Sequence, residues 1–170
     1  MGVRADASNL DPRDTAGYRV VVALREVALR LNLAGAEFAA RNDLHTTDLR
    51  AIIELLDAER TSVTATPTWL GGRLRLNSAS VTALVDRLER TGHVQRHRDI
   101  ADRRRVGLTV TEHAKRLGEA FFGPLIEQVM TITDGYEPPE RETIVRFLAE
   151  IAAAIPAGEL APRALAAEPT

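Results

Sequence analysis

The 170-residue sequence contains no cysteine. This absence excludes disulfides, thiolate zinc sites, iron–sulfur clusters and thiol-based redox sensors. Four histidines are present, but they form no HExxH pattern. His93 and His97 are four residues apart, yet they fall at a helix end and in a strand, so helical metal spacing does not apply to them. We therefore predict no metal site and no cofactor.

Aromatic residues and long apolar runs are also scarce. Aromatics make up only 4% of the chain, so its core must consist mainly of Leu, Val, Ile and Ala, which suits packed helices. No apolar run approaches the roughly 18 residues that span a bilayer. Residues 1–14 are polar and unlike a secretory signal, so we expect a flexible N-terminal arm, a cytoplasmic location and no membrane contact.

The net charge of −2 hides a segregation of charge along the chain. Residues 73–116 hold eleven basic and five acidic side chains, a net charge of +6, and the rest of the chain carries −8. A basic middle between acidic flanks is the charge pattern of a nucleic-acid-binding protein. A solvated Arg-rich surface is the alternative that charge alone leaves open.

Apolar periodicity predicts six helices and one β-hairpin. Thr46 or Thr47 is the expected cap of the second helix, and Pro67 suits the first turn of the third. Gly92 ends the fourth helix, after which the period changes from 3.6 to 2. The predicted helices run from about Asp14 to Arg41, from Thr46 or Thr47 through Leu56, from Pro67 through Leu76, from Ser78 to Thr91, from Thr111 through Val129, and from Pro138 to Ile155. The predicted strands are His93–Arg98 and Arg105–Val110.

This order predicts a mainly α winged helix-turn-helix fold with a small β-hairpin wing and N- and C-terminal dimerisation helices. Residues 44–112 would form the DNA-binding lobe. Residues 15–43 and 113–155 would form the helical dimerisation region, because their apolar stripes lack an obvious partner within one chain. A single-chain helical bundle is the alternative for those stripes. Residues 156–170 are an Ala/Pro/Glu-rich tail that we expect to be disordered.

The helix over Ser78–Thr91 has one apolar and one slim polar face. Its buried face would comprise Val81, Leu84, Val85 and Leu88. Its opposite face would comprise Ala79, Thr82, Ala83, Asp86 and Arg90, flanked by Ser80 and Arg87. Small residues at the start of a helix permit close approach to the major groove, and Ser, Thr and Arg can bond phosphates or base edges.

The hairpin would supply a second contact, because Arg fits a narrow minor groove. We expect Asp86 to pair with Arg90 at i,i+4, and Asp102 to brace a neighbouring Arg. A solvated charged turn is the alternative for this hairpin. The predicted DNA-binding residues are Ser78, Ala79, Ser80, Thr82, Ala83, Arg87, Arg90, Arg98, Asp102, Arg103 and Arg104.

Two segments resemble the MarR family of multiple-antibiotic-resistance regulators. Residues 77–94 (NSASVTALVDRLERTGHV) resemble its recognition helix, and residues 102–111 (DRRRVGLTVT) resemble its wing signature. The chain departs from the usual pattern at Ala114, where Gly is common, and at Gly71-Gly72, which either loosen their helix or allow close packing. The resemblance implies a homodimer on a palindromic operator, often a repressor, that releases double-stranded DNA when an anionic aromatic or lipophilic effector binds.

Apolar or amphipathic residues near the expected helix junctions are the candidates for an effector pocket, with core packing as the alternative. They are Phe38, His45, Trp69 and Phe121, together with Phe122. We predict that the chain is not an enzyme, since its Ser and His residues are too dispersed to nominate a nucleophile and base. The alternative function is a winged-helix module that docks proteins without binding DNA.

Overall fold

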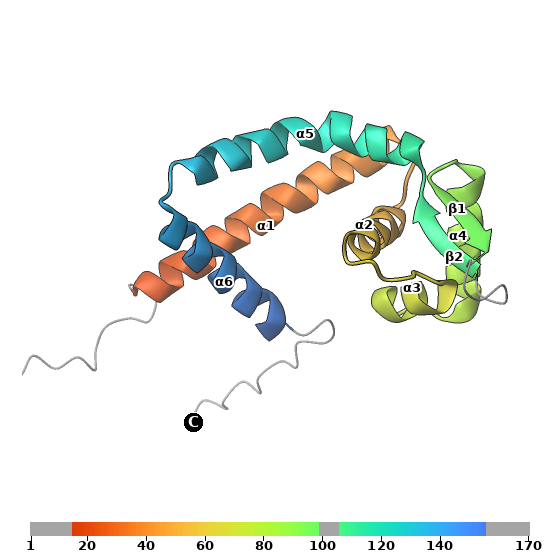
Figure 1. Ribbon diagram of the computed structural model, residues 1–170, viewed down its shortest axis with the longest axis horizontal. Coiled ribbons are helices and arrows are strands. Elements are labelled where there is room, and N and C mark those ends of the chain that lie inside the picture. Colours follow the sequence, from red (N-terminus) through yellow and green to blue (C-terminus); the bar gives the residue numbers. More distant parts are fainter. Residues whose placement is uncertain (1–14, 99–105, 156–170) are drawn as a thin grey trace, which may run out of the picture. The chain divides into compact units, whose positions relative to one another are not determined.

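The computed structural model describes residues 15–98 and 106–155 (Figure 1). Its order of elements confirms the predicted fold class, which is mainly helical with one two-stranded antiparallel hairpin. The predicted N-terminal arm and C-terminal tail lie outside the described residues. The elements are α1 (Ala16–Arg41), α2 (Thr46–Arg60), α3 (Pro67–Leu74), α4 (Ser78–Arg90), β1 (Val94–Arg98), β2 (Val106–Val110), α5 (Glu112–Asp134) and α6 (Pro138–Ala154).

The chain divides into two compact units between Phe121 and Phe122, within α5. The first unit contains α1, α2, α3, α4, the β1–β2 hairpin and the beginning of α5. In Figure 1 the hairpin and helices α2, α3 and α4 gather into one group, which we call the lobe. The second unit contains the rest of α5 and α6.

Side-chain caps fix where two elements of the lobe begin. Thr66 accepts a hydrogen bond from the Trp69 N–H at 3.2 Å, and Pro67 occupies the first turn of α3. Asn77 accepts from the Ser80 N–H at 2.9 Å and starts α4. These side chains satisfy amide groups that the first turn of a helix leaves without partners. The short α3, the tight connection and α4 therefore follow from local chemistry.

The predicted cap of α2 is wrong. The helix starts after His45 and not after a threonine. The His45 backbone N–H donates to the Asp48 carboxylate at 2.9 Å, so an acidic side chain one turn inside the helix closes its end. Asp48 is fully buried, which makes this contact part of the core of the lobe.

Both strands of the hairpin contact the helices of the lobe. Val94 pairs with Val110, and the register continues to Arg98 opposite Val106. The Leu108 N–H donates to the Ala65 carbonyl at 2.8 Å, so a backbone hydrogen bond ties β2 to the segment before α3. At the turn from α4, Gly92 has a φ of +74°, which confirms the predicted left-handed helix end.

The core lies inside the lobe. Leu55, Leu70, Val85, Leu88 and Val94 are at most 1% exposed. Each buried side chain of this size contributes about 1.5–3 kcal/mol to folding relative to an exposed one. The predicted buried face of α4 is thereby confirmed, since all four of its apolar residues are buried.

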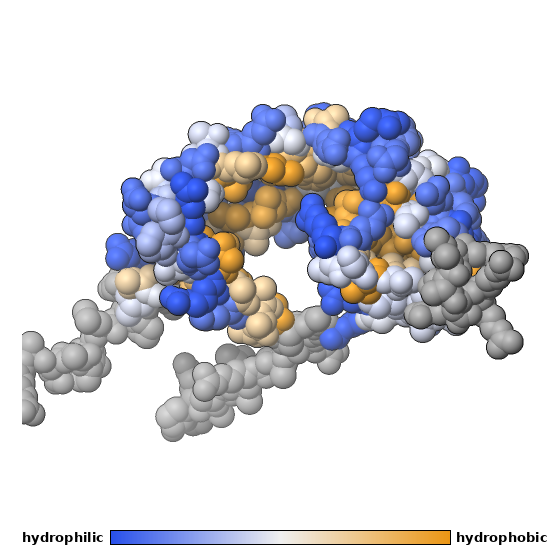
Figure 2. Space-filling view, viewed as in Figure 1, coloured by the Kyte–Doolittle hydropathy of each residue, from blue (hydrophilic) through white to orange (hydrophobic). Residues whose placement is uncertain are grey.

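The helices outside the lobe expose many large apolar side chains. No side chain in the described part of the second unit, residues 122–155, is buried. Helix length and hydropathy exclude a bilayer-spanning helix in residues 15–98 and 106–155. Figure 2 shows hydrophobic residues on the surface of these helices. The exposed large apolar residues of α1, α5 and α6 are Tyr18, Val20, Val21, Val27, Leu29, Leu31, Leu33, Ile126, Val129, Met130, Ile132, Ile144, Val145, Phe147 and Leu148.

Candidate nucleic-acid interface

The outer face of α4 is exposed along its length. Its first two turns carry only small side chains, and their slim profile allows another surface to approach closely. Thr82 donates its hydroxyl to the Ser78 carbonyl at 2.9 Å, which keeps its side chain close to the helix. The exposed residues on this face and its flank are Ser78, Ala79, Ser80, Thr82, Ala83, Asp86 and Arg90.

Helix α3 approaches α4 closely at Gly71. A Cβ atom at this position would lie 3.0 Å from Val81 Cγ2 and 3.2 Å from the Leu76 carbonyl oxygen. Gly71 is buried, whereas Gly72 is exposed with open space around its Cα. Of the two predicted explanations for this glycine pair, close packing therefore applies to Gly71.

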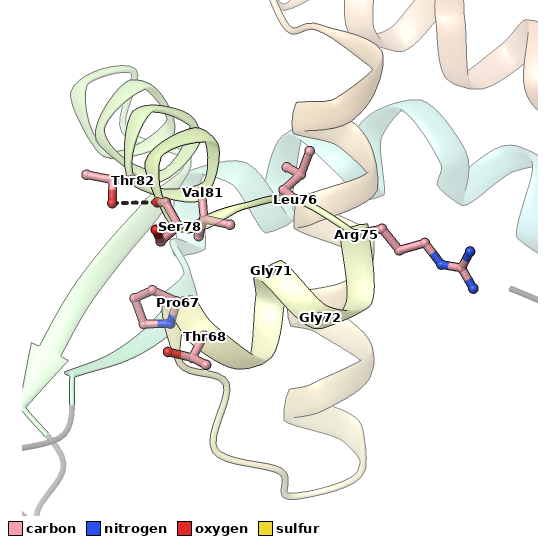
Figure 3. A pocket seen from close by; sticks show the side chains of 9 residues that line it. All are labelled: Pro67, Thr68, Gly71, Gly72, Arg75, Leu76, Ser78, Val81 and Thr82. Carbon is pink, nitrogen blue, oxygen red and sulfur yellow. Dashed lines mark hydrogen bonds between the residues drawn. The ribbon is translucent and has the colours of Figure 1, made fainter. Parts of the chain in front are cut away.

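A hollow of about 430 Å³ opens between α3 and α4 (Figure 3). Thr68, Ser78 and Thr82 contribute hydroxyl groups to its lining, and Val81 contributes an apolar wall. Arg75 follows α3 in the left-handed conformation, with a φ of +57°, and in Figure 3 its exposed side chain extends away from α4. Donors and acceptors thus lie beside the exposed start of α4.

Arg87, unlike the exposed residues of α4, forms an ion pair with a buried carboxylate of α2. Its Nε donates to Asp48 Oδ2 at 3.0 Å, and its Nη2 donates to Asp48 Oδ1. The hydrogen bond to Asp48 is the main cause that raises the pKa of Arg87. The side chain is 32% exposed, against 1% for Asp48. The pair joins α4 to the start of α2 across 39 residues, and periodicity in the sequence gives no signal for it.

The predicted pair between Asp86 and Arg90 is wrong. Asp86 instead pairs with Arg96 of β1, and Glu89 pairs with the same guanidinium. The hydrogen bond to Asp86 is the main cause that raises the pKa of Arg96. Two carboxylates one turn apart on α4 are therefore joined to the hairpin, because the strand comes close to that side of the helix.

The other predicted wing contacts fall largely on residues that are not described. Arg98 is the last residue of β1. Asp102, Arg103 and Arg104 lie outside the described residues, so their DNA-binding role stays a prediction.

His93 lies where α4 turns into β1 and is 5% exposed. Its Nδ1 is 2.9 Å from the Thr91 hydroxyl, and its ring centroid is 6.4 Å from that of His113. Nε2 is buried without a hydrogen-bond partner among the described residues. Burial lowers the pKa of His93, and the charge of His113 lowers it further, while Asp48 opposes both effects. The sequence pattern did not single out this residue as a buried titratable group.

The structure brings two of the effector candidates together. Phe38 and Phe121 meet edge to face with ring centroids 5.3 Å apart, and the Arg41 guanidinium lies 5.4 Å from the Phe121 centroid. Trp69 faces the Arg73 guanidinium at 6.0 Å. His45 lies at the start of α2, as described above.

Phe122 is a half-buried residue of α5, beyond the boundary of the first unit. Across the described ranges, no group of three His, Asp or Glu side chains is placed to hold a metal ion.

A helix pair with a slim exposed second helix, followed by a hairpin fixed to that helix, defines a winged helix-turn-helix protein. Residues 42–105 match the model of the MarR family, which includes the recognition-helix segment on which the resemblance was based. The chain is thus similar to the MarR family over the segment from α2 to the hairpin.

Curated proteins of similar sequence are named as transcriptional regulators. The HTH-type transcriptional regulator YcgE of Bacillus subtilis is 41% identical over 83 residues, 49% of this chain and 54% of that protein, so the match spans about half the length of the relative. The HTH-type transcriptional repressor YetL of the same species is 22% identical over 138 residues, 81% of each chain.

Solved structures share the fold. S. aureus MepR in complex with DNA has a TM-score of 0.52 at 19% identity, covering 76% of this chain and 95% of MepR. MepR bound to ethidium bromide has a TM-score of 0.56 at 19% identity, covering 85% and 99%.

Proposed function

We propose that the chain is a sequence-specific DNA-binding transcriptional regulator that acts as a homodimer on a palindromic operator. The observation that carries this proposal is the exposed face of α4, with slim residues from Ser78 to Ala83 in front of a firmly packed apolar face. A helix of this kind fits the major groove, where base edges present distinct donor and acceptor patterns. The net charge of +6 over residues 73–116 adds attraction to phosphates.

The exposed apolar residues support the dimer. The described residues 122–155 have no buried side chain, and α1 exposes Val27, Leu31 and other large apolar residues. Leaving such surface in water is costly, and a second copy of the chain would cover it in a symmetric interface. The family and the names of its relatives favour regulation over the alternative of a protein-docking module, and repression is the mode named for YetL.

A binding competition tests this proposal. A labelled duplex from the DNA around the protein's own gene is mixed with the full chain, and an unlabelled random duplex of equal length competes. We expect specific complexes that contain two chains, and sedimentation equilibrium of the free protein should give a dimer. Binding to neither duplex, or a monomer in both measurements, would overturn the proposal.

A small effector that releases the DNA is the second part of the proposal. The contact of Phe38 with Phe121 and the cation beside it form an aromatic cluster with positive charge, suited to a planar anion. MepR, which shares the fold, has been solved with bound ethidium. Benzoate, a planar aromatic anion, matches the positive charge of this cluster and is compared with an aliphatic acid of the same charge. Release of the duplex by benzoate but not by an aliphatic acid supports a planar anionic effector, and release by neither probe counts against this cluster as the site.

A further inference from the structure

Arg96 joins the hairpin to α4 by two side-chain ion pairs and one backbone contact. Its Nη1 donates to Glu89 Oε2 and its Nη2 to Asp86 Oδ1. Its backbone N–H also donates to Glu89 Oε1 at 3.4 Å. The two carboxylates are three residues apart and thus share one side of the helix. A planar guanidinium holds both with donors in a fixed fork, whereas the three donors of an ammonium rotate and fix the geometry less firmly.

The Arg96 contact lies beyond the base of the hairpin. The base is held by other means, since Thr111 donates its hydroxyl to the Gly92 carbonyl at 2.6 Å and Val94 is buried. Farther out, Arg96 pairs with Leu108, which is buried, and the next pair on this face ends in Val106, which is 40% exposed. Among the hairpin side chains that the structure describes, which do not include that of Arg98, Arg96 is therefore the outermost one that an ion pair ties to α4.

Stability alone is a weak reason for such a cluster. Asp86 and Glu89 are 55% and 42% exposed, and Arg96 is 29% exposed. Exposed ion pairs are screened by water and salt and contribute little to folding. Their geometric effect is larger, because two charge-assisted hydrogen bonds fix the angle between a strand and a helix.

We propose that Arg96 is a positioning residue for DNA binding that holds the β1–β2 hairpin at a fixed angle to α4 by bridging Asp86 and Glu89. This inference rests on the proposed function. A helix in the major groove and a hairpin beside it can bind one duplex together only if the angle between them suits that duplex. Arg96 sets this angle before DNA binds, which lowers the cost of ordering the hairpin in the complex.

A second role for the cluster makes the opposite prediction and thus allows a test. Asp86 lies on the exposed face of α4, where its charge would repel phosphate, and Arg96 also neutralises that charge. If neutralisation were the whole role, removing both carboxylates would leave DNA binding intact or strengthen it. If the bridge positions the hairpin, the same change would weaken binding although it removes two negative charges.

The experiment compares three variants with the wild type in the full chain: Arg96→Met, the double variant Asp86→Asn with Glu89→Gln, and Arg96→Lys. Anisotropy titrations give the affinity for the specific and for a random duplex, and thermal unfolding monitors the fold. Arg60→Met is the matched control, because it removes an exposed ion pair with Asp57 that stays within α2.

We expect Arg96→Met and the double carboxylate variant each to weaken specific binding about tenfold, the size of one lost base contact. Binding to the random duplex should change less. Arg96→Lys should recover only part of the lost specific binding, because its ammonium keeps the charge but lacks the fixed fork of the guanidinium. The unfolding midpoints should stay close to that of Arg60→Met. Specific binding by the double variant that equals or exceeds wild type would overturn the positioning role, as would equal losses on both duplexes.

Failure of the two proposals is distinguishable. Wild-type protein that binds no duplex would overturn the proposed function and the positioning role with it. Wild-type protein that binds specifically, together with an Arg96→Met variant that binds equally well, would overturn the positioning role alone.

Discussion

The carboxylate of Asp48, buried at the start of α2, receives hydrogen bonds from the guanidinium of Arg87 on α4. It also accepts the backbone N–H of His45, the cap residue at which α2 begins. One acidic side chain thus closes one helix and ties it to the helix whose outer face we assign to DNA. Arg87 belongs to the packing of the lobe through this contact.

We predict that Arg87→Ala lowers the free energy of unfolding by about 3 kcal/mol, because it leaves the buried charge of Asp48 without its partner. Urea denaturation measures the change. Arg90→Ala on the exposed face of α4 is the matched control and should shift stability by no more than about 0.5 kcal/mol. Adding Asp48→Asn to the Arg87→Ala variant should restore part of the loss, since it removes the buried charge. Equal stability of Arg87→Ala and wild type would contradict the structural role.

Thr82→Glu should abolish specific DNA binding without unfolding the protein. The side chain is exposed, so the fold tolerates a carboxylate, but in the groove the added charge would meet phosphates. Thr131→Glu is the control, because Thr131 is also an exposed helical threonine that donates to a carbonyl four residues earlier. Circular dichroism and anisotropy titration report fold and binding. Normal operator affinity of the Thr82→Glu variant would remove α4 from the groove.

The glycine pair of α3 should respond in opposite directions. Gly72→Ala should raise stability by about 0.5–1 kcal/mol, since alanine favours helix and the site is open. Gly71→Ala should lower stability, because its methyl group would press on Val81 and on the Leu76 carbonyl. It should also weaken DNA binding by moving α3 away from α4. Chemical denaturation of both variants checks this, and a Gly71→Ala variant as stable as Gly72→Ala would refute the close approach.

The free energy of unfolding should decrease as the pH falls, because His93 is buried in its neutral form. Its pKa is lowered first by burial and then by His113, so the folded protein binds a proton at this site less readily than the unfolded chain, whose ordinary value is 6.5. The contribution of His93 is therefore fully present above about pH 7.5 and is lost as the pH falls below 6.5 toward the lowered pKa. Urea midpoints measured from neutral to mildly acidic pH should decline for wild type and decline less for His93→Gln. Parallel declines would exclude His93 as the source.

The sequence was sufficient for features that depend on neighbouring residues. The spacing of Val81, Leu84, Val85 and Leu88 predicted the buried face of α4, and the structure confirms it. Gly92 and the change of period marked the turn into the hairpin. Two motifs at the right separation indicated a resemblance to the MarR family, and residues 42–105 match the model of that family. These features depend on residues close together in the sequence, so they can be predicted without knowledge of the fold.

Local patterns do not predict contacts between segments that are distant in the sequence. Asp48 and Arg87 are 39 residues apart, and charge spacing along one helix favoured Arg90 over Arg96 as the partner of Asp86. The i,i+4 rule considers one helix in isolation, whereas β1 brings a competing guanidinium that bridges two carboxylates. The prediction of a threonine cap for α2 is wrong for a related reason. The preference for threonine at a helix start does not consider that the Asp48 carboxylate, within the first turn, accepts the His45 N–H.

A salt titration of DNA binding tests the central claim most directly. The affinity of the full chain is measured for a duplex from around its own gene and for a random duplex, over a range of salt concentrations. We predict tight binding to the former by a dimer, with an affinity that falls steeply with salt, by about 0.9 in log–log slope for each phosphate contact. Binding to neither duplex at low salt, or an affinity independent of salt, would contradict the assignment of α4 and the basic hairpin to DNA.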